Sequence, residues 1–320
     1  MKMKKIGILT SGGDAPGMNA AIRAVVRTAL VNNMEVMGIY KGYLGLFEGE
    51  ILPMDRSSVS DIVQKGGTIL KTARFPEFAD PKVREKAAQV LRVYGVEGLV
   101  VIGGDGSFKG AKGLSDLGIK TIGIPGTIDN DMGYTDRTIG FDTAQNTVID
   151  AINKIRDTSS SHQRVSVVEV MGRDCGDLAL YAGLAGGATT ILVPEKKYSK
   201  EEILKTVMEG KRHKKHHNLV VIAEGVGNAD EIAKEIEDVS GIETRATVLG
   251  HIQRGGMPTA YDRILATRLG HRAVELLMEG KSGRVVGTVR GDIVDYDINE
   301  ALKMERPFNE KLYQIAMDLV

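Results

Sequence analysis

Cysteine is almost absent from this chain of 320 residues, which contains only Cys175. A single cysteine excludes an intramolecular disulfide and fits a reducing compartment. Long apolar runs are absent as well, because nothing approaches the roughly 20 consecutive apolar residues that a membrane-spanning helix needs. The basic segment 1–5 precedes only four apolar residues, too few for a secretory signal. We therefore expect a soluble, cytoplasmic protein that does not engage a membrane.

An excess of charge of either sign is also lacking. Lys plus Arg number 42 and Asp plus Glu number 42, so the formal net charge is zero with histidine neutral. No global field then favours nucleic acid as a partner, and any anion site must be built locally. The six histidines offer no convincing pair of metal ligands outside one basic run, so we expect no zinc site.

Short apolar runs that end abruptly at small polar clusters are what the chain does contain. A buried parallel strand has this appearance, and in open α/β sheets ligands bind beyond the carboxyl ends of the strands. Helical periodicity follows each of the first four runs, which predicts an α/β fold with mainly parallel sheets and loops that converge on one cleft. The predicted strands are 6–9, 99–102, 122–124, 165–170, 219–223 and 247–249, and the predicted helices are 19–30, 110–117, 143–157 and 178–185.

No Pro/Ser-rich linker divides the chain, although its length suffices for two domains. The runs at 165–170 and 219–223 are expected to form a second sheet, and the chain is expected to return to the first sheet after Gly255. We predict two Rossmann-like three-layer α/β/α domains with the active site in the cleft between them. Their predicted bounds are 1–138 plus 252–305 for the first domain and 139–251 plus 306–320 for the second.

The first candidate site is the loop Gly103-Gly104-Asp105-Gly106-Ser107. Glycines directly after a strand let backbone N–H groups approach phosphate oxygens, and the start of the next helix adds a favourable dipole. Asp105 can then anchor Mg²⁺, which usually takes one or two carboxylates plus waters and phosphates. The alternative is a tight turn in which Asp105 only caps the helix.

The second candidate is the loop Pro125-Gly126-Thr127-Ile128-Asp129-Asn130-Asp131. Two carboxylates two residues apart repel each other unless a cation or a proton donor uses them. Phosphoryl transfer needs a base for the attacking hydroxyl, and an aspartate fills this role in kinases. Asp129 is the candidate base. The alternative is an Asx-turn that starts the following helix.

Five arginines appear where a phosphorylated substrate would need them. Guanidinium groups bind phosphate oxygens in bidentate fashion and neutralise charge in the transition state. The segment His251-Ile252-Gln253-Arg254 adds a histidine and an arginine three residues apart, beside paired glycines. Each arginine on its own is more often part of a surface ion pair. The candidates are Arg74, Arg164, Arg173, Arg245 and Arg254.

Together these motifs resemble those of bacterial ATP-dependent 6-phosphofructokinases. The resemblance runs in order over almost the whole chain, through 10–19, 103–107, 125–131, 171–173 and 250–256. It implies transfer of the ATP γ-phosphoryl group to the 1-hydroxyl of fructose 6-phosphate, a step of glycolysis. It further implies that Asp105 holds Mg²⁺ and that ATP lies against Gly13, Arg74, Phe75, Gly104, Asp105, Gly106 and Ser107.

The same resemblance assigns roles to the remaining loops. Asp129 would deprotonate the sugar hydroxyl, Thr127 and Arg173 would stabilise the transferring group, and Asp131 would tune the base. The sugar itself would contact Met171, Gly172 and Glu224. His251 and Arg254 would bind the 6-phosphate with Arg164 and Arg245 of a neighbouring subunit, which implies a homotetramer. The substrate set also includes Ile128, Ile252 and Gln253.

An effector pocket for ADP or phosphoenolpyruvate is implied as well. The basic run at 211–217 belongs to it, although such a run is more often a solvated helix end. The family usually has Glu where this chain has Thr189, and often Arg where it has His213, so the response to these effectors stays open. The implied effector residues are Arg23, Arg27, Arg56, Ser60, Asp61, Arg156, His213, Lys215, His216 and His217.

Two glycines favour ATP over pyrophosphate as the donor. Pyrophosphate-dependent relatives resemble this pattern but carry Asp where Gly106 stands and Lys where Gly126 stands. A carboxylate at position 106 would repel and obstruct the α-phosphate of ATP. The motifs leave two further functions open. One is a non-catalytic nucleotide-sensing protein of the same fold, and the other is a lipid or NAD kinase, which would leave the loops at 125–131 and 251–256 unexplained.

Overall fold

The computed structural model describes residues 3–212 and 218–319, and their contacts divide the chain into two compact units. Unit 1 contains 1–127, 132–143 and 254–305, and unit 2 contains 128–131, 144–253 and 306–320. This division departs from the expected bounds in three short segments, 128–131, 139–143 and 252–253. In each case the chain is crossing from one unit to the other, where apolar patterning gives no signal.

Unit 1 is built on a seven-stranded sheet whose order is β11-β10-β5-β4-β1-β2-β3. Its five inner strands are parallel, and each edge strand is antiparallel to its neighbour. The central strand β4, Gly-Leu-Val-Val-Ile-Gly, is buried throughout, as its unbroken apolar run predicts. The strands are β1 (Lys5–Thr10), β2 (Glu35–Ile39), β3 (Ile51–Met54), β4 (Gly98–Gly103), β5 (Lys120–Pro125), β10 (Arg284–Val289) and β11 (Asp292–Asp297).

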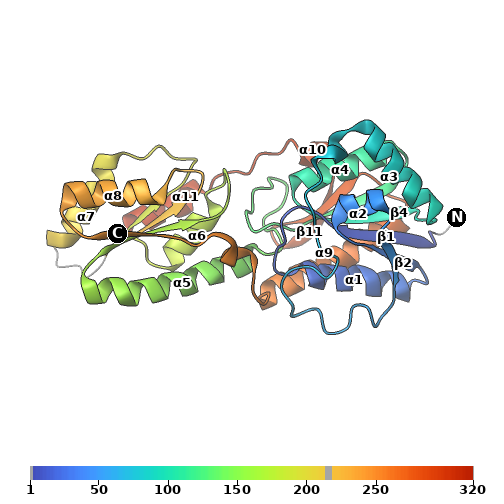
Figure 1. Ribbon diagram of the computed structural model, residues 1–320, viewed down its shortest axis with the longest axis horizontal. Helices are drawn as coiled ribbons and strands as arrows, with labels where there is room; N and C mark the ends of the chain where they lie inside the picture. Colours follow the sequence, from blue (N-terminus) through green and yellow to red (C-terminus); the bar gives the residue numbers. More distant parts are fainter. Residues whose placement is uncertain (1–2, 213–217, 320) are drawn as a thin grey trace. The chain divides into compact units, whose positions relative to one another are not determined.

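Helices cover both faces of this sheet. Helix α1 packs on α9 at one face, and α2, α3 and α4 lie together at the other (Figure 1). The second face buries Leu46, Ala87 and Phe108 against Leu9 and Leu99 of the sheet. The helices are α1 (Met18–Val31), α2 (Gly42–Glu48), η1 (Pro76–Ala79), α3 (Pro81–Val93), α4 (Asp105–Asp116), α9 (Ala260–Met278) and α10 (Ile298–Ala301).

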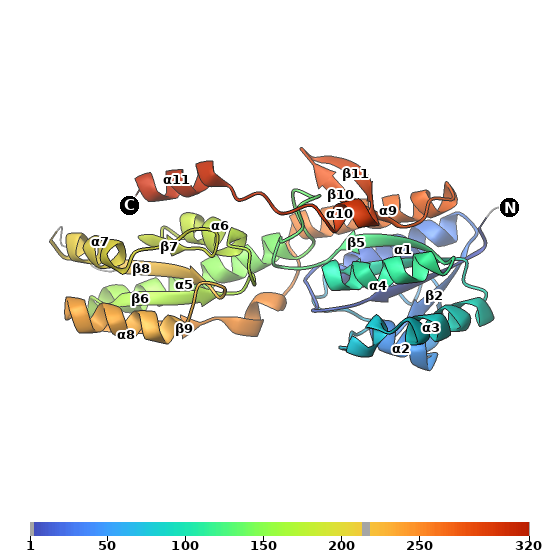
Figure 2. The ribbon, with the colours of Figure 1, turned by 90° about the horizontal axis from the view of Figure 1, so that it is seen from above.

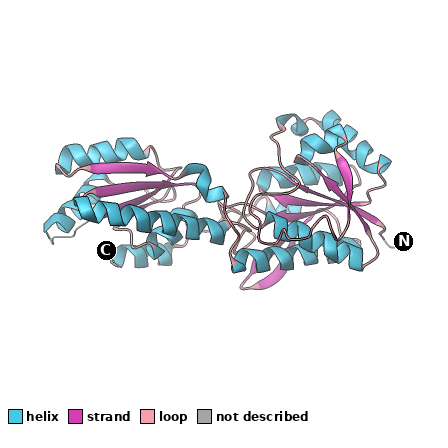
Figure 3. Ribbon diagram, turned by 60° about the horizontal axis from the view of Figure 1, so that its bottom comes forward, coloured by secondary structure: helices cyan, strands magenta, loops and turns pink. Residues whose placement is uncertain are grey.

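Unit 2 is built on a four-stranded parallel sheet in the order β7-β8-β6-β9. Helices α7 and α8 cover one face and α5 and α6 the other, so strands lie between helices in each unit (Figure 3). The C-terminal α11 packs beside α6 (Figure 2). The elements are β6 (Val165–Val170), β7 (Thr190–Leu192), β8 (Asn218–Ala223), β9 (Thr244–Val248), α5 (Phe141–His162), α6 (Asp177–Ala185), α7 (Lys200–Arg212), α8 (Ala229–Ser240), η2 (Gly250–Arg254) and α11 (Glu310–Asp318).

The predicted three-layer α/β architecture with mainly parallel sheets is confirmed, and the six predicted strands divide equally between the two sheets. The prediction for the last strand is wrong: it spans Thr244–Val248 rather than 247–249. It is an edge strand in which exposed and half-buried residues such as Arg245 and Val248 outnumber buried ones, so its apolar pattern is weak. Gly250, with φ of +54°, then starts a short 3₁₀ turn.

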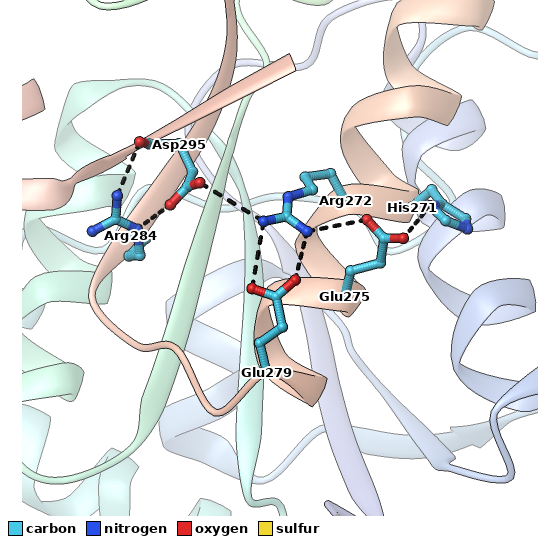
Figure 4. Close-up of polar contacts among 6 residues, drawn as sticks. All are labelled: His271, Arg272, Glu275, Glu279, Arg284 and Asp295. Carbon is cyan, nitrogen blue, oxygen red and sulfur yellow. Dashed lines mark hydrogen bonds and ion pairs between the residues drawn. The ribbon is translucent and has the colours of Figure 1, made fainter.

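A network of ion pairs ties α9 to the β10–β11 hairpin in unit 1 (Figure 4). Arg272 lies 2.7 Å from Glu279, 3.2 Å from Glu275 and 3.9 Å from Asp295. Arg284 of β10 binds the same Asp295. Networks of this kind contribute more to stability than isolated surface ion pairs do. This network holds the β10–β11 hairpin, which forms one edge of the sheet, against α9.

Candidate active site

The phosphate-binding loop predicted after β4 packs directly on the loop after β1. A Cβ atom on Gly103 would lie 2.4 Å from the carbonyl oxygen of Ser11 and 2.4 Å from Oγ of Ser107, so no side chain fits there. The N–H of Ser11 donates to the carbonyl of Ile102 at 2.9 Å. Position 103 must therefore be glycine for the loops after β1 and β4 to pack this closely.

Helix α4 begins at Asp105, so its first backbone N–H groups face the loop. Asp105 is half-exposed, and its carboxylate accepts from the N–H of Gly106 at 2.6 Å and from Nζ of Lys109 at 3.0 Å. A Cβ atom on Gly106 would meet nothing within 4 Å, so this side of the helix start is open. The geometry suits a phosphate approached by helix N–H groups.

The segment that carries Arg74 and Phe75 lies against the β1 loop. Thr72 donates its hydroxyl to the carbonyl of Gly12 at 2.7 Å. Arg74 is exposed, and the half-buried ring of Phe75 lies 5.5 Å from that of Phe47. The structure thus brings the segments of the predicted nucleotide residues together in unit 1.

Arg254 is placed by the structure on unit 1, beside the β1 loop. Its Nη1 atom would lie 3.0 Å from a Cβ atom added to Gly13. The predicted sugar-phosphate partners of Arg254, at 251–253, belong to unit 2. In this structure the guanidinium group of Arg254 is therefore next to a predicted ATP residue.

Asp129 is 3% exposed, and its Oδ2 atom lies 3.3 Å from Nε of Arg173. Arg173 has φ of +55°, and Glu224 fixes this bend by accepting the N–H groups of Gly172 at 3.1 Å and Arg173 at 2.7 Å. The loops after β6 and β8 thus hold a guanidinium group against the buried carboxylate. A carboxylate in this setting accepts a proton while the adjacent cation neutralises phosphate charge.

Thr127 starts the same loop but belongs to unit 1. Its N–H donates to the carbonyl of Ile139 at 3.1 Å, and its carbonyl accepts the Thr138 hydroxyl at 2.7 Å. The side chain of Ile128 is buried, and Asp131 is half-buried.

Gln253 is fully buried and joins two strand ends of unit 2. Its side chain accepts from the N–H of Met171 at 3.2 Å and donates to the carbonyl of Gly250 at 2.9 Å. His251 and Ile252 of the same turn are exposed. Gln253 therefore shapes the turn, and His251 is the ionisable residue that the turn presents outward.

Arg164 and Arg245 lie at the amino end of the four-stranded sheet, whereas Arg173 and Glu224 follow its carboxyl end. Glu243 joins the two arginines, accepting from Nε of Arg164 and Nη2 of Arg245 at 2.8 and 2.7 Å. The hydrogen bond from Arg164, with that from Arg245, holds the pKa of the Glu243 carboxyl below its usual value. Sequence reasoning missed Glu243, whose only signal is its place two residues before Arg245.

The predicted effector residues that the structure describes come from both units. Arg23 and Arg27 lie one turn apart on α1, and Ser60 donates to the carbonyl of Arg56 in a turn that ends at Asp61 with φ of +52°. The predicted effector residues His213, Lys215, His216 and His217 lie outside the described residues.

Arg156 belongs to unit 2 and donates to the carbonyl of Gly186. Thr189, where the family usually has Glu, exchanges hydrogen bonds with the backbone of Leu219 at 2.8 and 3.1 Å. The hydroxyl of Thr189 therefore has a structural role in the link to the start of β8.

The residues of this region fit a magnesium ion that is held mainly by the nucleotide. Within 3–212 and 218–319, no group of three or more His, Cys, Asp or Glu side chains could hold a metal ion by itself. Asp105 instead offers one half-exposed carboxylate at the start of α4, whose N–H groups suit a phosphate. That donor set suits Mg²⁺ held largely by nucleotide phosphates and water.

None of the helices described is both long and apolar enough to cross a membrane.

Comparison with known proteins agrees with this geometry. The family model described as Phosphofructokinase matches residues 5–277. ATP-dependent 6-phosphofructokinase 1 of Clostridium perfringens is 66% identical over 314 residues, covering 98% of both chains. The ATP-dependent 6-phosphofructokinase of Clostridium tetani is 67% identical over 317 residues, covering 99% of both.

Solved structures show the same fold. Phosphofructokinase from Saccharomyces cerevisiae matches with a TM-score of 0.93 and 33% identity over 98% of this chain, which spans half the length of that chain. A pyrophosphate-dependent phosphofructokinase from Marinobacter aquaeolei matches with a TM-score of 0.88 over 98% of this chain and 92% of its own, and at 23% identity it shares the fold alone. The chain described here belongs to the phosphofructokinase family.

Proposed function

We propose that this chain transfers the γ-phosphoryl group of ATP to the 1-hydroxyl of fructose 6-phosphate, giving fructose 1,6-bisphosphate and ADP in glycolysis. The observation that carries the proposal is the buried Asp129 carboxylate 3.3 Å from the Arg173 guanidinium. The names of relatives that are 66 and 67% identical, from Clostridium perfringens and Clostridium tetani, support the same reaction.

In the proposed mechanism Asp129 accepts the proton of the sugar hydroxyl as its oxygen attacks the γ-phosphorus in line. Arg173 and Thr127 stabilise the negative charge of the transferring group, and Asp131 tunes the base. Glu224 keeps Arg173 in its bent conformation through two backbone hydrogen bonds. The sugar lies against Ile128, Met171 and Gly172.

ATP binds to unit 1 in this proposal, at Gly13, Arg74, Phe75 and the segment Gly104–Ser107. Asp105 holds Mg²⁺, which neutralises phosphate charge when bound. The open space at Gly106 supports ATP rather than pyrophosphate, because a larger donor needs that room. Relatives named as ATP-dependent agree with this choice of donor.

The sugar phosphate binds to unit 2, and two chains share each site. Arg164 and Arg245 lie at the opposite end of the sheet from Arg173, so they serve the site of another chain in a homotetramer. The 6-phosphate is bound by these arginines together with His251 and Arg254, and Ile252 and Gln253 belong to the same substrate-binding turn. This assembly is expected to work in the cytoplasm.

Effector binding by ADP or phosphoenolpyruvate is proposed with a restriction. Arg23, Arg27, Arg56, Ser60, Asp61 and Arg156 supply cations and polar groups, with His213, Lys215, His216 and His217 from the basic run. Thr189 has no carboxylate for an effector-bound Mg²⁺, and its hydroxyl is already bonded. Activation by Mg²⁺-ADP is therefore weaker than in a relative with glutamate at this position.

A coupled assay tests the reaction. The purified chain is incubated with Mg²⁺ and fructose 6-phosphate, with either ATP or pyrophosphate as donor, and fructose 1,6-bisphosphate is measured through aldolase. We expect turnover with ATP and little with pyrophosphate. ATP binding without turnover would favour a nucleotide-sensing protein, and phosphorylation of NAD or a lipid alone would favour those kinase classes.

A further inference from the structure

The loop that carries Asp129 is held by the residue next to it. Asn130 is fully buried and has φ of +54°, a conformation that asparagine tolerates better than most residues. Its side-chain amide donates to Oδ2 of Asp177 at 2.8 Å. The orientation of the loop therefore depends on what fixes Asp177.

Arg306 fixes that carboxylate. Its Nη2 and Nε atoms donate to the same Oδ2 atom of Asp177 at 2.9 and 3.1 Å. Asp177 is 3% exposed and is the first residue of α6, which follows the loop of Arg173. One carboxylate thus joins the loop of the base, the loop of its guanidinium partner and the C-terminal segment of the chain.

The C-terminal segment has its own attachments to unit 2, so Arg306 is held independently of Asp177. Glu310 pairs with Lys196 at 2.7 Å, and Asn309 donates to the hydroxyl of Tyr181 at 3.3 Å. These contacts lie on α6 and the segment after β7, away from Asn130. They provide a means of loosening the segment without removing the guanidinium from Asp177.

We propose that Asp177 and Arg306 are positioning residues for the phosphoryl transfer: they act through Asn130 to hold the Asp129 carboxylate against Arg173. This inference rests on the proposed function and deepens it. The proton acceptor must stay within hydrogen-bond reach of the sugar hydroxyl, and a misplacement of about 1 Å costs roughly 100-fold in rate. The buried charge of Asp177 also requires the Arg306 cation as its partner.

Removing Arg306 and removing Asp177 have opposite effects on the electrostatic environment of Asp129. Loss of the Arg306 cation leaves an uncompensated carboxylate beside the loop, which disfavours ionised Asp129. Loss of the Asp177 charge has the opposite effect. The other charged or titratable groups around the loop are Arg173 and Glu224 at the strand ends, Cys175 and Glu195 beside the start of α6, and Asp131 in the loop itself.

The test compares Arg306→Gln, Arg306→Lys and Asp177→Asn with the parent protein in full-length form. We expect kcat to fall about 10- to 100-fold in the first and third variants, with the KM for ATP within about threefold. The acidic limb of the kcat–pH profile should move to higher pH in Arg306→Gln and to lower pH in Asp177→Asn. Arg306→Lys keeps the charge and should recover most of the kcat.

Glu310→Gln is the matched control, because it loosens the same segment and leaves Asp177 paired. Hydrogen exchange of a peptide covering 128–131 adds a readout that does not need activity, and it should rise in Arg306→Gln but not in the control. The inference would be overturned if Arg306→Gln and Asp177→Asn both had the pH profile and the hydrogen exchange of the parent. An active parent would still support the proposed reaction in that case. An inactive parent would overturn the reaction, and the exchange measurement would still decide whether the pair holds the loop.

Discussion

Asp262 of α9 accepts a hydrogen bond from the backbone N–H of Thr143 at 2.8 Å, so a fully buried carboxylate fixes the start of α5. It also accepts from the N–H of Gly140 at 2.9 Å. Burial raises the pKa of Asp262 from 3.8 to about 6, because desolvation outweighs these hydrogen bonds. The folded state therefore binds a proton here at a pH where the unfolded chain has lost it.

A group of this kind makes the fold less stable as the pH rises. The destabilisation caused by ionising buried Asp262 is absent below pH 3.8, increases between pH 3.8 and about 6, and is complete above about pH 6. We therefore compare the unfolding free energy of the parent with that of Asp262→Asn. As the pH falls from 7 to 4, the value for the parent should increase relative to the variant by up to about 3 kcal/mol. Chemical denaturation at several pH values measures this difference, and Asp116→Asn, an exposed helix position, is the control. A difference that stays constant with pH would contradict the assignment.

Asp129→Ser should abolish most turnover. The variant lacks the group that we propose as the proton acceptor, so we expect kcat to fall by about 100- to 10,000-fold, the usual contribution of a general base. The KM for fructose 6-phosphate should change far less, because the phosphate-binding residues remain. Steady-state kinetics at saturating ATP provide the measurement, and turnover within tenfold of the parent would show that another group is the base.

Gly106→Asp should impair ATP use. The position is open beside the start of α4, where we propose that the ATP phosphates bind, and a carboxylate there would repel the α-phosphate. We expect kcat/KM for ATP to fall by about 100-fold or more, which corresponds to about 3 kcal/mol. Gly106→Ala is the control, since a Cβ atom at 106 meets nothing within 4 Å and should leave ATP use almost intact. An equal loss in both variants would attribute the effect to the backbone.

Five inner strands, β1, β4, β5, β6 and β8, could be predicted because they are buried almost throughout and have nearly unbroken apolar sequences. The inner strands β2 and β10 were not predicted. The predicted bounds of β4 and β6 lie within one residue of the observed ones. The loops that follow such strands could be assigned to a site because parallel strands present their carboxyl ends at one edge of the sheet. Edge strands such as β9 carry mixed patterns, and their bounds were missed for that reason.

The residues that hold the site in place could not be predicted from the same patterns. Glu243, Asp177 and Arg306 act through side chains that are 38%, 3% and 17% exposed, and their partners lie far along the chain or in another element. Asp177 begins a helix, which in a sequence indicates only a capping role. Asp177 and Arg306 are 129 residues apart and Glu243 and Arg164 are 79 apart, so the only local signal is the position of Glu243 two residues before Arg245.

Glu243→Gln should weaken sugar-phosphate binding without affecting ATP. Its two carboxylate oxygens hold Arg164 and Arg245 side by side at the amino end of the sheet. With a neutral amide that accepts at one oxygen only, the two cations lose their common partner and their alignment. We expect the KM for fructose 6-phosphate to rise about tenfold, or about 1.4 kcal/mol, and the KM for ATP to stay constant. Asp238→Asn, at an exposed position of α8, is the control.

The proposed sharing of sites between chains gives a further prediction. Because Arg245 lies at the opposite sheet end from Arg173, a chain with Arg245→Ala still has its own Asp129, and a chain with Asp129→Ser still has its own Arg245. Each variant alone should be nearly inactive at low fructose 6-phosphate. Hybrids formed by refolding the two together should regain activity, because some sites then combine the intact base of one chain with the intact arginine of another. Mixtures no more active than their separate components would place Arg245 in the site of its own chain.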